Sequence, residues 1–299
     1  MNGRTLALIA LSITALIYGI TFTIAKEVMP KHILPYGFIV VRIGGAAVFF
    51  WITSLFIKQQ KIEREDYKRI AVAAFFGVCL NMLTFFKGLS YTTPISASAI
   101  MVTAPILVLI FSSILIKEKI VPIKILGVII GLIGAVILII YGNTSSKHGS
   151  NVVLGNFLVF INAASYGLYL VLVKKLINKY NPIIFVRWLY LFGFIMVLPF
   201  GFTELINIDF YTMDTSVYLK IGYVVFFSTC ITYLFNLFAL TTLKPTTVSV
   251  FIYLQPVLAT MFALFRGSDS LNVVKVIATL LIFLGVALVT KQVPKTTNK

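Results

Sequence analysis

The pattern of hydrophobic and polar positions divides the chain into long apolar stretches separated by short polar ones. Ten of these stretches are about 20 residues long or more, the length that an α-helix needs to cross a bilayer core of about 30 Å. None shows the strict alternation expected of strands in a membrane barrel. The sequence therefore predicts an all-α integral membrane protein with ten transmembrane helices, near residues 5–28, 36–57, 68–91, 94–116, 122–141, 152–175, 182–202, 216–241, 245–265 and 271–290.

Composition supports the membrane assignment. Of the 299 residues, 60% are hydrophobic and 11% are charged, whereas soluble domains are nearer half apolar and a quarter charged. The longest polar stretch, residues 58–69, is only a loop, so no soluble domain is expected. Cys79 and Cys230 lie inside apolar stretches and imply no disulfide framework.

The net charge of +16 comes from basic residues that gather in alternate loops. The loops on the side of the N-terminus hold most of the Lys and Arg residues, and the opposite side holds few. This asymmetry follows the positive-inside rule and predicts that both termini are cytoplasmic. We interpret the basicity as a topology signal, expect no nucleic-acid partner, and place the multi-pass chain in the cytoplasmic membrane of the cell, which its short loops suit.

Residues far apart in the chain repeat at a nearly fixed spacing. The only two cysteines, Cys79 and Cys230, lie 151 residues apart, and two pairs of prolines keep the same spacing. Nearer the N-terminus the spacing falls to 148 and below, as a loop of different length would cause. The other matching pairs are Pro94 and Pro245, Pro105 and Pro256, Tyr18 and Tyr166, Lys26 and Lys174, and Arg42 and Arg187.

These pairs predict two five-helix units, residues 1–145 and 146–299. An odd number of spans forces the second unit to enter the membrane upside down. The loops agree, because loop 58–69 is strongly basic and its counterpart, 203–214, is acidic and has no Lys or Arg. Two inverted five-helix repeats are typical of transporters, whose near-equivalent halves exchange inward-open and outward-open shapes.

The paired prolines Pro105 and Pro256 fall near the middle of apolar stretches. A mid-span proline removes a backbone hydrogen bond and bends its helix. We interpret the two as symmetry-related bends that shape a central cavity, although proline is also simply common in membrane helices.

Acidic residues and histidines are expected only in loops or at the ends of spans. Proton-coupled carriers often use a membrane-buried carboxylate, and hydrolysis or group transfer needs acid–base or nucleophilic groups. None of the nine acids, and neither His32 nor His148, is predicted at mid-depth. We therefore expect no metal site, no cofactor and no enzyme activity, and transport that does not depend on a buried carboxylate.

Three cations do fall within spans. Arg42 and Arg187 lie roughly 9 and 8 Å from the ends of their helices at 1.5 Å per residue. Each either anchors its helix by reaching the interface or acts in gating or charge selection. Lys87 either reaches the interface in the same way, attracts a carboxylate substrate, or titrates as a buried lysine can.

The remaining mid-depth polar groups are aromatic hydroxyls, amides and alcohols. Such a lining suits a small, partly apolar solute such as an amino acid or a comparable metabolite, although the same residue types also join membrane helices. The segment GVIIGLIG (127–134) favours close helix packing, either in a homodimer or inside the bundle. The candidate substrate-cavity residues are Tyr18, Asn81, Thr84, Lys87, Asn162, Tyr166, Tyr169, Tyr233, Asn236, Tyr253 and Gln255.

The segment from Phe85 to Ile120 is a small-residue-rich helix with Pro105 in its middle and Glu118 just past its end. Residues 237–271 repeat this arrangement, and VRIGGAAV (41–48) is an arginine-bearing second helix. In these features the whole chain resembles the EamA family of the drug/metabolite transporter superfamily. It departs at Tyr18, where the family often has Trp, and at Asp269, where a glutamate is usual.

The resemblance implies a ten-helix carrier with cytoplasmic termini and a cavity lined by helices one, three, four, six, eight and nine. Many members export amino acids or other metabolites. We therefore expect an alternating-access transporter in the lipid bilayer, most simply an exporter of small organic metabolites. The alternatives are a membrane sensory or binding protein with the same fold and, among transporters, a nucleotide-sugar or drug carrier.

Overall fold

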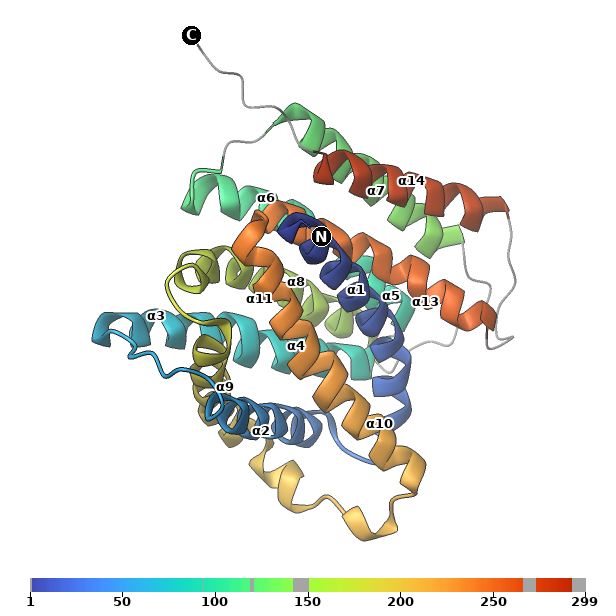
Figure 1. Ribbon diagram of the computed structural model, residues 1–299. Coiled ribbons are helices and arrows are strands. Elements are labelled where there is room, and N and C mark those ends of the chain that lie inside the picture. The colour runs from blue at the N-terminus through green and yellow to red at the C-terminus, as the bar shows by residue number, and fades with distance from the viewer. Residues whose placement is uncertain (1, 93, 119–120, 142–150, 266–272, 292–299) are drawn as a thin grey trace.

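The structure is a computed structural model that describes residues 2–92, 94–118, 121–141, 151–265 and 273–291. The regular elements in these ranges are all helices, packed side by side in one bundle (Figure 1). In the first half of the chain the helices are α1 (Gly3–Val28), α2 (Pro35–Ser54), α3 (Arg64–Ala74), the π-helical η1 (Phe75–Cys79), α4 (Leu80–Tyr91), α5 (Pro94–Met101), α6 (Ala104–Leu115) and α7 (Pro122–Tyr141).

The second half repeats this order with two short additions, both of them 3-10 turns. Its helices are α8 (Val152–Ile177), α9 (Pro182–Ile206), the 3-10 turn η2 (Phe210–Thr212), α10 (Thr215–Val225), the π-helical η3 (Phe226–Ile231), α11 (Thr232–Thr242), α12 (Pro245–Ser249), the 3-10 turn η4 (Val250–Tyr253), α13 (Leu254–Phe265) and α14 (Val273–Thr290).

Among the described residues, six helical runs are long and apolar enough to cross a membrane. They coincide with the expected stretches 5–28, 36–57, 68–91, 152–175, 182–202 and 216–241. The other four expected stretches are helical too, and the stretches 122–141 and 271–290 correspond to the single helices α7 and α14. The remaining two, 94–116 and 245–265, are interrupted shortly before Pro105 and Pro256, because proline has no backbone N–H to bond to the preceding turn.

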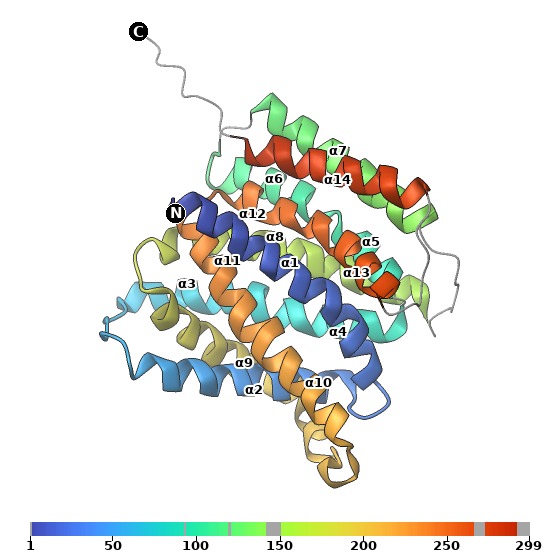
Figure 2. The same cartoon turned by 45° about the vertical axis from the view of Figure 1, so that its right-hand side comes forward.

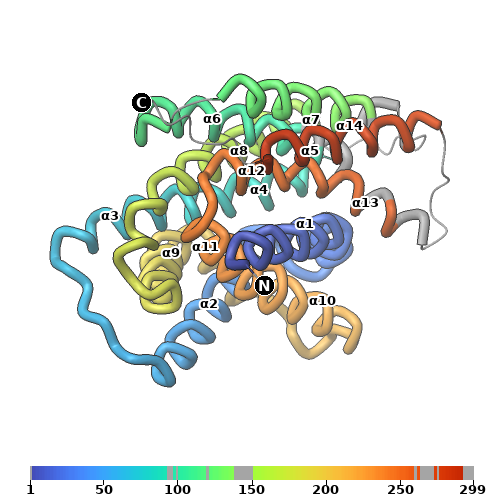
Figure 3. The backbone as a smooth tube through the Cα atoms, turned by 45° about the horizontal axis from the view of Figure 1, so that its top comes forward, coloured from blue at the N-terminus to red at the C-terminus, as the bar shows by residue number. Residues whose placement is uncertain are grey.

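The bundle is framed by two pairs of helices. Helices α7 and α14 lie side by side along one edge, and α2 and α9 lie together along the opposite edge (Figures 1 and 2). Between them the packing is reciprocal. Helix α1 packs against α11 and α13, and helix α8 packs against α4 and α6. Figure 3 shows the same bundle with its top tipped forward, and α7 and α14 again lie side by side along one edge.

Glycines allow α7 and α14 to approach closely. A Cβ atom on Gly285 would lie 2.6 Å from the Gly131 backbone nitrogen, and one on Gly127 would lie 2.9 Å from the Gly285 carbonyl oxygen. A Cβ on Gly134 would meet Ala278 at 2.8 Å. The GVIIGLIG segment is therefore used inside the bundle, where small residues let backbones touch. A homodimer stays a prediction.

The helix ends form two faces, which we call the N-terminal face, where α1 begins, and the far face, where α1 ends. On the far face the Glu204 carboxylate accepts hydrogen bonds from the backbone N–H groups of Tyr36 and Gly37 at 2.7 and 2.8 Å. Lys220 pairs with Glu27 there at 2.7 Å. The Glu204 contacts satisfy the free amides at the start of α2.

The C-terminal ends of α4 and α11 are each capped by a lysine side chain. Lys26 donates to the carbonyl oxygens of Leu89, Ser90 and Thr92 at the end of α4. Lys174, which lies 148 residues after Lys26, donates to the carbonyl oxygens of Leu240 and Leu243 at the end of α11. A lysine at a helix C-terminus satisfies unpaired carbonyls and the helix dipole.

Candidate functional site

A cavity of about 640 Å³ lies at the centre of the bundle. Its walls come from both halves of the chain, through α1, α2, α4, α5, α8, η3, α11, η4 and α13. The apolar part of the lining is Phe22, Met82, Phe85, Phe86, Met101 and Ile252. The polar part is Tyr18, Thr21, Arg42, Asn81, Asn162, Tyr166, Ser228, Tyr233 and Gln255.

A smaller cavity of about 220 Å³ adjoins the first and shares four of its residues, Tyr18, Tyr166, Ile252 and Gln255. Along α1, the smaller cavity touches the chain on the N-terminal side of Tyr18, and the larger one touches it on the far side. The shared residues therefore form a partition, and Tyr18 and Tyr166, which lie 148 residues apart, are both part of it.

Arg42 enters the cavity from α2 and is only 5% exposed. Its Nε donates to Thr229 Oγ1, and its Nη2 donates to the Ser228 carbonyl oxygen at 2.8 Å and to Ser228 Oγ at 3.4 Å. The guanidinium also lies 4.9 Å from the ring centroid of Phe86. These partners are neutral, and they belong to the π-helical segment η3 and to α4.

Two asparagines hold α4 and α8 together beside the cavity. Asn162 Nδ2 donates to the Asn81 carbonyl oxygen at 2.8 Å, and Asn81 Nδ2 donates back to the Asn162 carbonyl oxygen at 3.4 Å. The side-chain Oδ1 of Asn162 is buried and has no hydrogen-bond partner in the protein. A buried amide oxygen without a donor is costly, so this atom is suited to accept a hydrogen bond from a bound solute.

The structure brings together most of the residues that the sequence marks for the cavity. Tyr18, Asn81, Asn162, Tyr166, Tyr233 and Gln255 line the larger cavity, and Asn236 lines the smaller one.

Four expected cavity residues line neither of these two cavities. Thr84 donates to the Leu80 carbonyl oxygen in its own helix at 2.7 Å. Lys87 lies 5.1 and 4.9 Å from the ring centroids of Tyr36 and Tyr91.

Tyr169 and Tyr253 instead cover glycines. A Cβ on Gly77 would lie 2.2 Å from the Tyr169 ring, and one on Gly131 would lie 2.4 Å from the Tyr253 ring. Tyr253 also donates to the Val128 carbonyl oxygen at 3.2 Å. In each case the tyrosine ring packs against a neighbouring helix instead of facing a cavity.

The other marked residues lie around the cavity or at the faces. Arg187 Nη1 donates to Ser54 Oγ at 3.1 Å and to Gln59 Oε1 at 2.8 Å. Pro105 is buried at the start of α6, and Pro256 lies two residues into α13.

Sequence reasoning missed several lining residues, and it marked Arg42 for anchoring, gating or charge selection without placing it in the cavity. The others follow from helical spacing, because Thr21 and Phe22 lie three and four residues beyond Tyr18 on the same helix face. Phe85 stands in the same relation to Asn81. The place of Arg42 depends on a contact with η3, 186 residues away, which no local pattern reveals.

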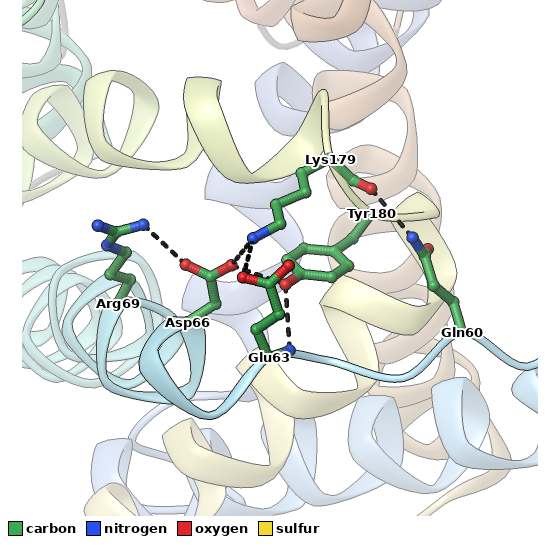
Figure 4. A network of polar contacts seen from close by, with 6 residues as sticks. All are labelled: Gln60, Glu63, Asp66, Arg69, Lys179 and Tyr180. Carbon is green, nitrogen blue, oxygen red and sulfur yellow. Dashed lines mark hydrogen bonds and ion pairs between the residues drawn. The ribbon is translucent and has the colours of Figure 1, made fainter.

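The N-terminal face is held together by an ion-pair network (Figure 4). Lys179 Nζ lies 2.7 Å from Asp66 Oδ2 and 2.5 Å from Glu63 Oε2. Tyr180 donates to Asp66 Oδ2 at 2.6 Å. The carboxylates of Asp66 and then Glu63 raise the pKa of Lys179 above its ordinary value. Lys179 therefore stays charged at neutral pH and joins the start of α3 to the end of α8.

Glu118 forms a second contact on this face. Its carboxylate accepts a hydrogen bond from Thr246 Oγ1 at 2.8 Å and lies 3.9 Å from Lys244 Nζ.

In the part of the chain that the structure describes, no three His, Cys, Asp or Glu side chains gather as they would around a metal ion.

Comparison with known proteins identifies the family. The model of the EamA-like transporter family matches twice, over residues 5–140 and 153–291. The chain belongs to the EamA-like transporter family. It is 28% identical to an uncharacterized transporter of Archaeoglobus fulgidus over 98% of this chain and 99% of the relative. It is 25% identical to the uncharacterized transporter YyaM of Bacillus subtilis over 90% and 88% of the two chains.

A solved crystal structure has the same fold, with a TM-score of 0.74, 17% identity, and coverage of 96% of this chain and 98% of the other. Family, relatives and apolar helices together support a multi-pass membrane transporter.

Proposed function

We propose that this EamA-family protein carries small organic metabolites, such as amino acids, across the cytoplasmic membrane by alternating access, and that it acts as an exporter. The observation that carries the proposal is the pair of cavities on either side of the Tyr18 and Tyr166 partition. A carrier needs one binding site that faces each side of the membrane in turn. Two adjoining cavities with shared walls supply this geometry. The export direction rests on the resemblance to exporting family members.

We further propose that the chain crosses the membrane ten times as two inverted repeats, residues 1–145 and 146–299, with both termini in the cytoplasm. Three observations support this arrangement. The family model matches once in each half. The π-helical segments η1 and η3 begin 151 residues apart. The lysine caps at the ends of α4 and α11 correspond between the halves.

In this conformation the larger cavity lies on the far-face side of the partition. The N-terminal face, proposed to be cytoplasmic, is held by Lys179 with Glu63 and Asp66, and by Glu118 with Thr246. Exchange to the other conformation requires these contacts to part, while the far face closes. The interruptions before Pro105 and Pro256 would give α5 with α6, and α12 with α13, the freedom to bend.

The chemistry of the lining supports this class of cargo. Aromatic and thioether side chains cover most of one wall, and amides and hydroxyls converge from α4, α8 and α13. Such a cavity suits a small solute with one apolar part and a few hydrogen-bonding groups. Tyr18 and Tyr166 would contact this solute from both halves, and Asn162 Oδ1 would accept one of its donors.

The test is efflux from liposomes. Purified protein is reconstituted into liposomes loaded with a mixture of radiolabelled amino acids, and the loss of each is followed over time. We expect selective efflux of a subset that is abolished by Tyr166→Ala and largely kept by Tyr166→Phe, because the ring forms the partition. Tyr211→Ala, at a fully exposed tyrosine, is the matched control.

Absence of efflux for every amino acid and for a broad panel of other metabolites, from protein with normal thermal unfolding, would contradict the carrier. Efflux that Tyr166→Ala leaves unchanged would contradict the proposed path through the partition.

A further inference from the structure

Arg42 is a buried cation whose recorded partners are all neutral. It is 5% exposed, and its contacts are two groups of Ser228, the hydroxyl of Thr229 and the ring of Phe86. We infer that Arg42 is the anion-binding group of the cavity, and that the cargo carries a carboxylate which the guanidinium binds. This inference rests on the proposed function and narrows its substrate class.

Arg42 has no counter-ion among the described residues. Burying an uncompensated charge is expensive, and buried charges in proteins are normally paired. The carboxylates near either face are engaged elsewhere, Glu204 at the start of α2 and Glu118 with Thr246. None of the ion pairs recorded among the described residues includes Arg42. An anion that enters the cavity would supply the negative charge that pairs with the Arg42 guanidinium.

The guanidinium is held in a fixed orientation. Nε and Nη2 bond to Thr229 and Ser228 and fix the plane of the group, while Nη1 donates none of the recorded hydrogen bonds. Arginine recognises a carboxylate through its parallel N–H groups. A guanidinium oriented by η3 and by the Phe86 ring loses little freedom when it binds an anion at its open side.

The charge of the lining distinguishes carboxylates from more highly charged anions. Arg42 is the one cation in the described lining of the cavity, because Lys87 lies between Tyr36 and Tyr91 and Arg187 contacts Ser54 and Gln59. A single cation matches a single negative charge, whereas a phosphate monoester carries nearly two. The Phe22 and Phe85 side of the cavity accepts the apolar part of the same solute. A small carboxylate with an aliphatic or aromatic chain meets these conditions.

The test uses pairs of probes that differ only in their charged group. Thermal unfolding of the purified full-length protein in detergent is measured with isocaproate and isopentylamine, and with phenylpropionate and phenylethylamine. We expect both acids to raise the melting temperature and both amines to leave it unchanged. Loss of the charged hydrogen bonds in Arg42→Gln should weaken acid binding roughly tenfold to a hundredfold.

A second variant guards against misfolding of Arg42→Gln. In Ser228→Asp a carboxylate stands next to the guanidinium and supplies the counter-ion from within the protein. We expect this variant to lose the response to acids. Arg187→Gln, which removes the repeat partner at the N-terminal end of α9, is the control and should keep the full response.

Several outcomes overturn the inference. Amines that stabilise the protein as well as acids do, acids that give no shift with the wild-type chain, or an acid response that persists in Ser228→Asp would each do so. If the variants fail to fold, the comparison of acids with amines in the wild-type protein decides alone.

Liposome efflux separates this inference from the carrier itself. Transport of amines or neutral solutes through the cavity would contradict the anion-binding role of Arg42 and would support the carrier function. Arg42-dependent binding of acids without efflux of any solute leaves the anion site and removes the carrier.

Discussion

Two π-helical segments, η1 and η3, begin 151 residues apart in the sequence. They differ in the side chains that contact them at the centre of the bundle. At η3, Ser228 and Thr229 present a carbonyl and hydroxyls to Arg42 beside the larger cavity. At η1, the position that matches Ser228 is Gly77, and the Tyr169 ring lies against it. The hydroxyl of Tyr233 donates to the Gly77 carbonyl oxygen. A π-helical turn exposes backbone carbonyls, and the two halves use them for different side chains.

The neighbours of the two segments differ in size as well. Three tyrosines pack together near η1, with ring centroids 5.9 Å apart for Tyr169 and Tyr233 and 5.1 Å apart for Tyr190 and Tyr233. The repeat spacings of 148, 145 and 151 residues place smaller or more flexible side chains at the matching positions near η3. These pairs are Tyr169 with Thr21, Tyr190 with Gly45, and Tyr233 with Met82.

The two halves therefore fill matching positions at the centre of the bundle with side chains of different volume. Tyr233 of this cluster forms part of the wall of the larger cavity, of about 640 Å³, and the adjoining cavity is smaller, at about 220 Å³. Rigid-body exchange of two halves would therefore give two access states that differ in shape as well as in direction.

The largest predicted effect comes from removing the centre of the tyrosine cluster. Tyr233→Ala deletes two ring contacts and the hydrogen bond to Gly77, and buried aromatic truncations cost about 3–5 kcal/mol. We expect a loss of this size in the free energy of unfolding, measured in mixed micelles. Tyr211→Ala is the exposed control, and a Tyr233 variant as stable as that control would show that the cluster does not stabilise the centre of the bundle.

A smaller effect is expected from adding one methyl group at η1. The Cβ of Gly77→Ala would lie 2.2 Å from the Tyr169 ring, and overpacking costs about 1–3 kcal/mol. Gly222→Ala, where a Cβ meets nothing within 4 Å, should be neutral or stabilising. The same unfolding measurement checks both, and equal stability of the two variants would contradict the close packing at η1.

The network on the N-terminal face should control access to the smaller cavity. Asp66→Asn weakens the hydrogen bonds of Tyr180 and Lys179 and should cost about 1–2 kcal/mol. It should also speed maleimide labelling of a cysteine placed at Thr14 by several-fold. The raised pKa of Lys179 means that its contribution is present at neutral pH and is lost only as the pH rises through that raised value. Labelling that is unchanged in Asp66→Asn would show that this network does not control access to the smaller cavity.

The smallest effects are expected at the two lysine caps, where the halves are alike. Lys26→Met and Lys174→Met each remove a charge from carbonyls at a helix end, a change worth about 0.5–1 kcal/mol. Because the two caps correspond, the two losses in unfolding free energy should agree. A clear inequality would indicate that only one cap holds its helix.

The course of the helices was largely predictable from the sequence, and the reason is physical. Hydrophobic length alone marks spans, so α1, α2, α8 and α9 lie where the apolar stretches place them. The matching cysteines Cys79 and Cys230 predicted a repeat, and they fall in η1 and η3. The π-helical form of these segments was not predictable, because no residue pattern marks it.

The cavity was predictable only in part. Tyr18 and Tyr166 stood out because they match in the repeat, and they do lie in the shared partition. Tyr253 and Tyr169 were equally plausible by depth and residue type, yet each covers a glycine of a neighbouring helix. Which way a polar side chain points depends on the helix opposite, and that information is distributed over residues more than 90 positions apart.

Ile252 offers the most direct test of the central claim, because it lines both cavities. In a variant with Cys79 and Cys230 replaced by alanine, a single cysteine at position 252 is labelled in proteoliposomes by an impermeant maleimide from either side. The account predicts labelling from both sides, with Asp66→Asn raising the rate from the N-terminal face and lowering it from the far face. Labelling from one side only, unchanged by Asp66→Asn, would contradict alternating access through this cavity.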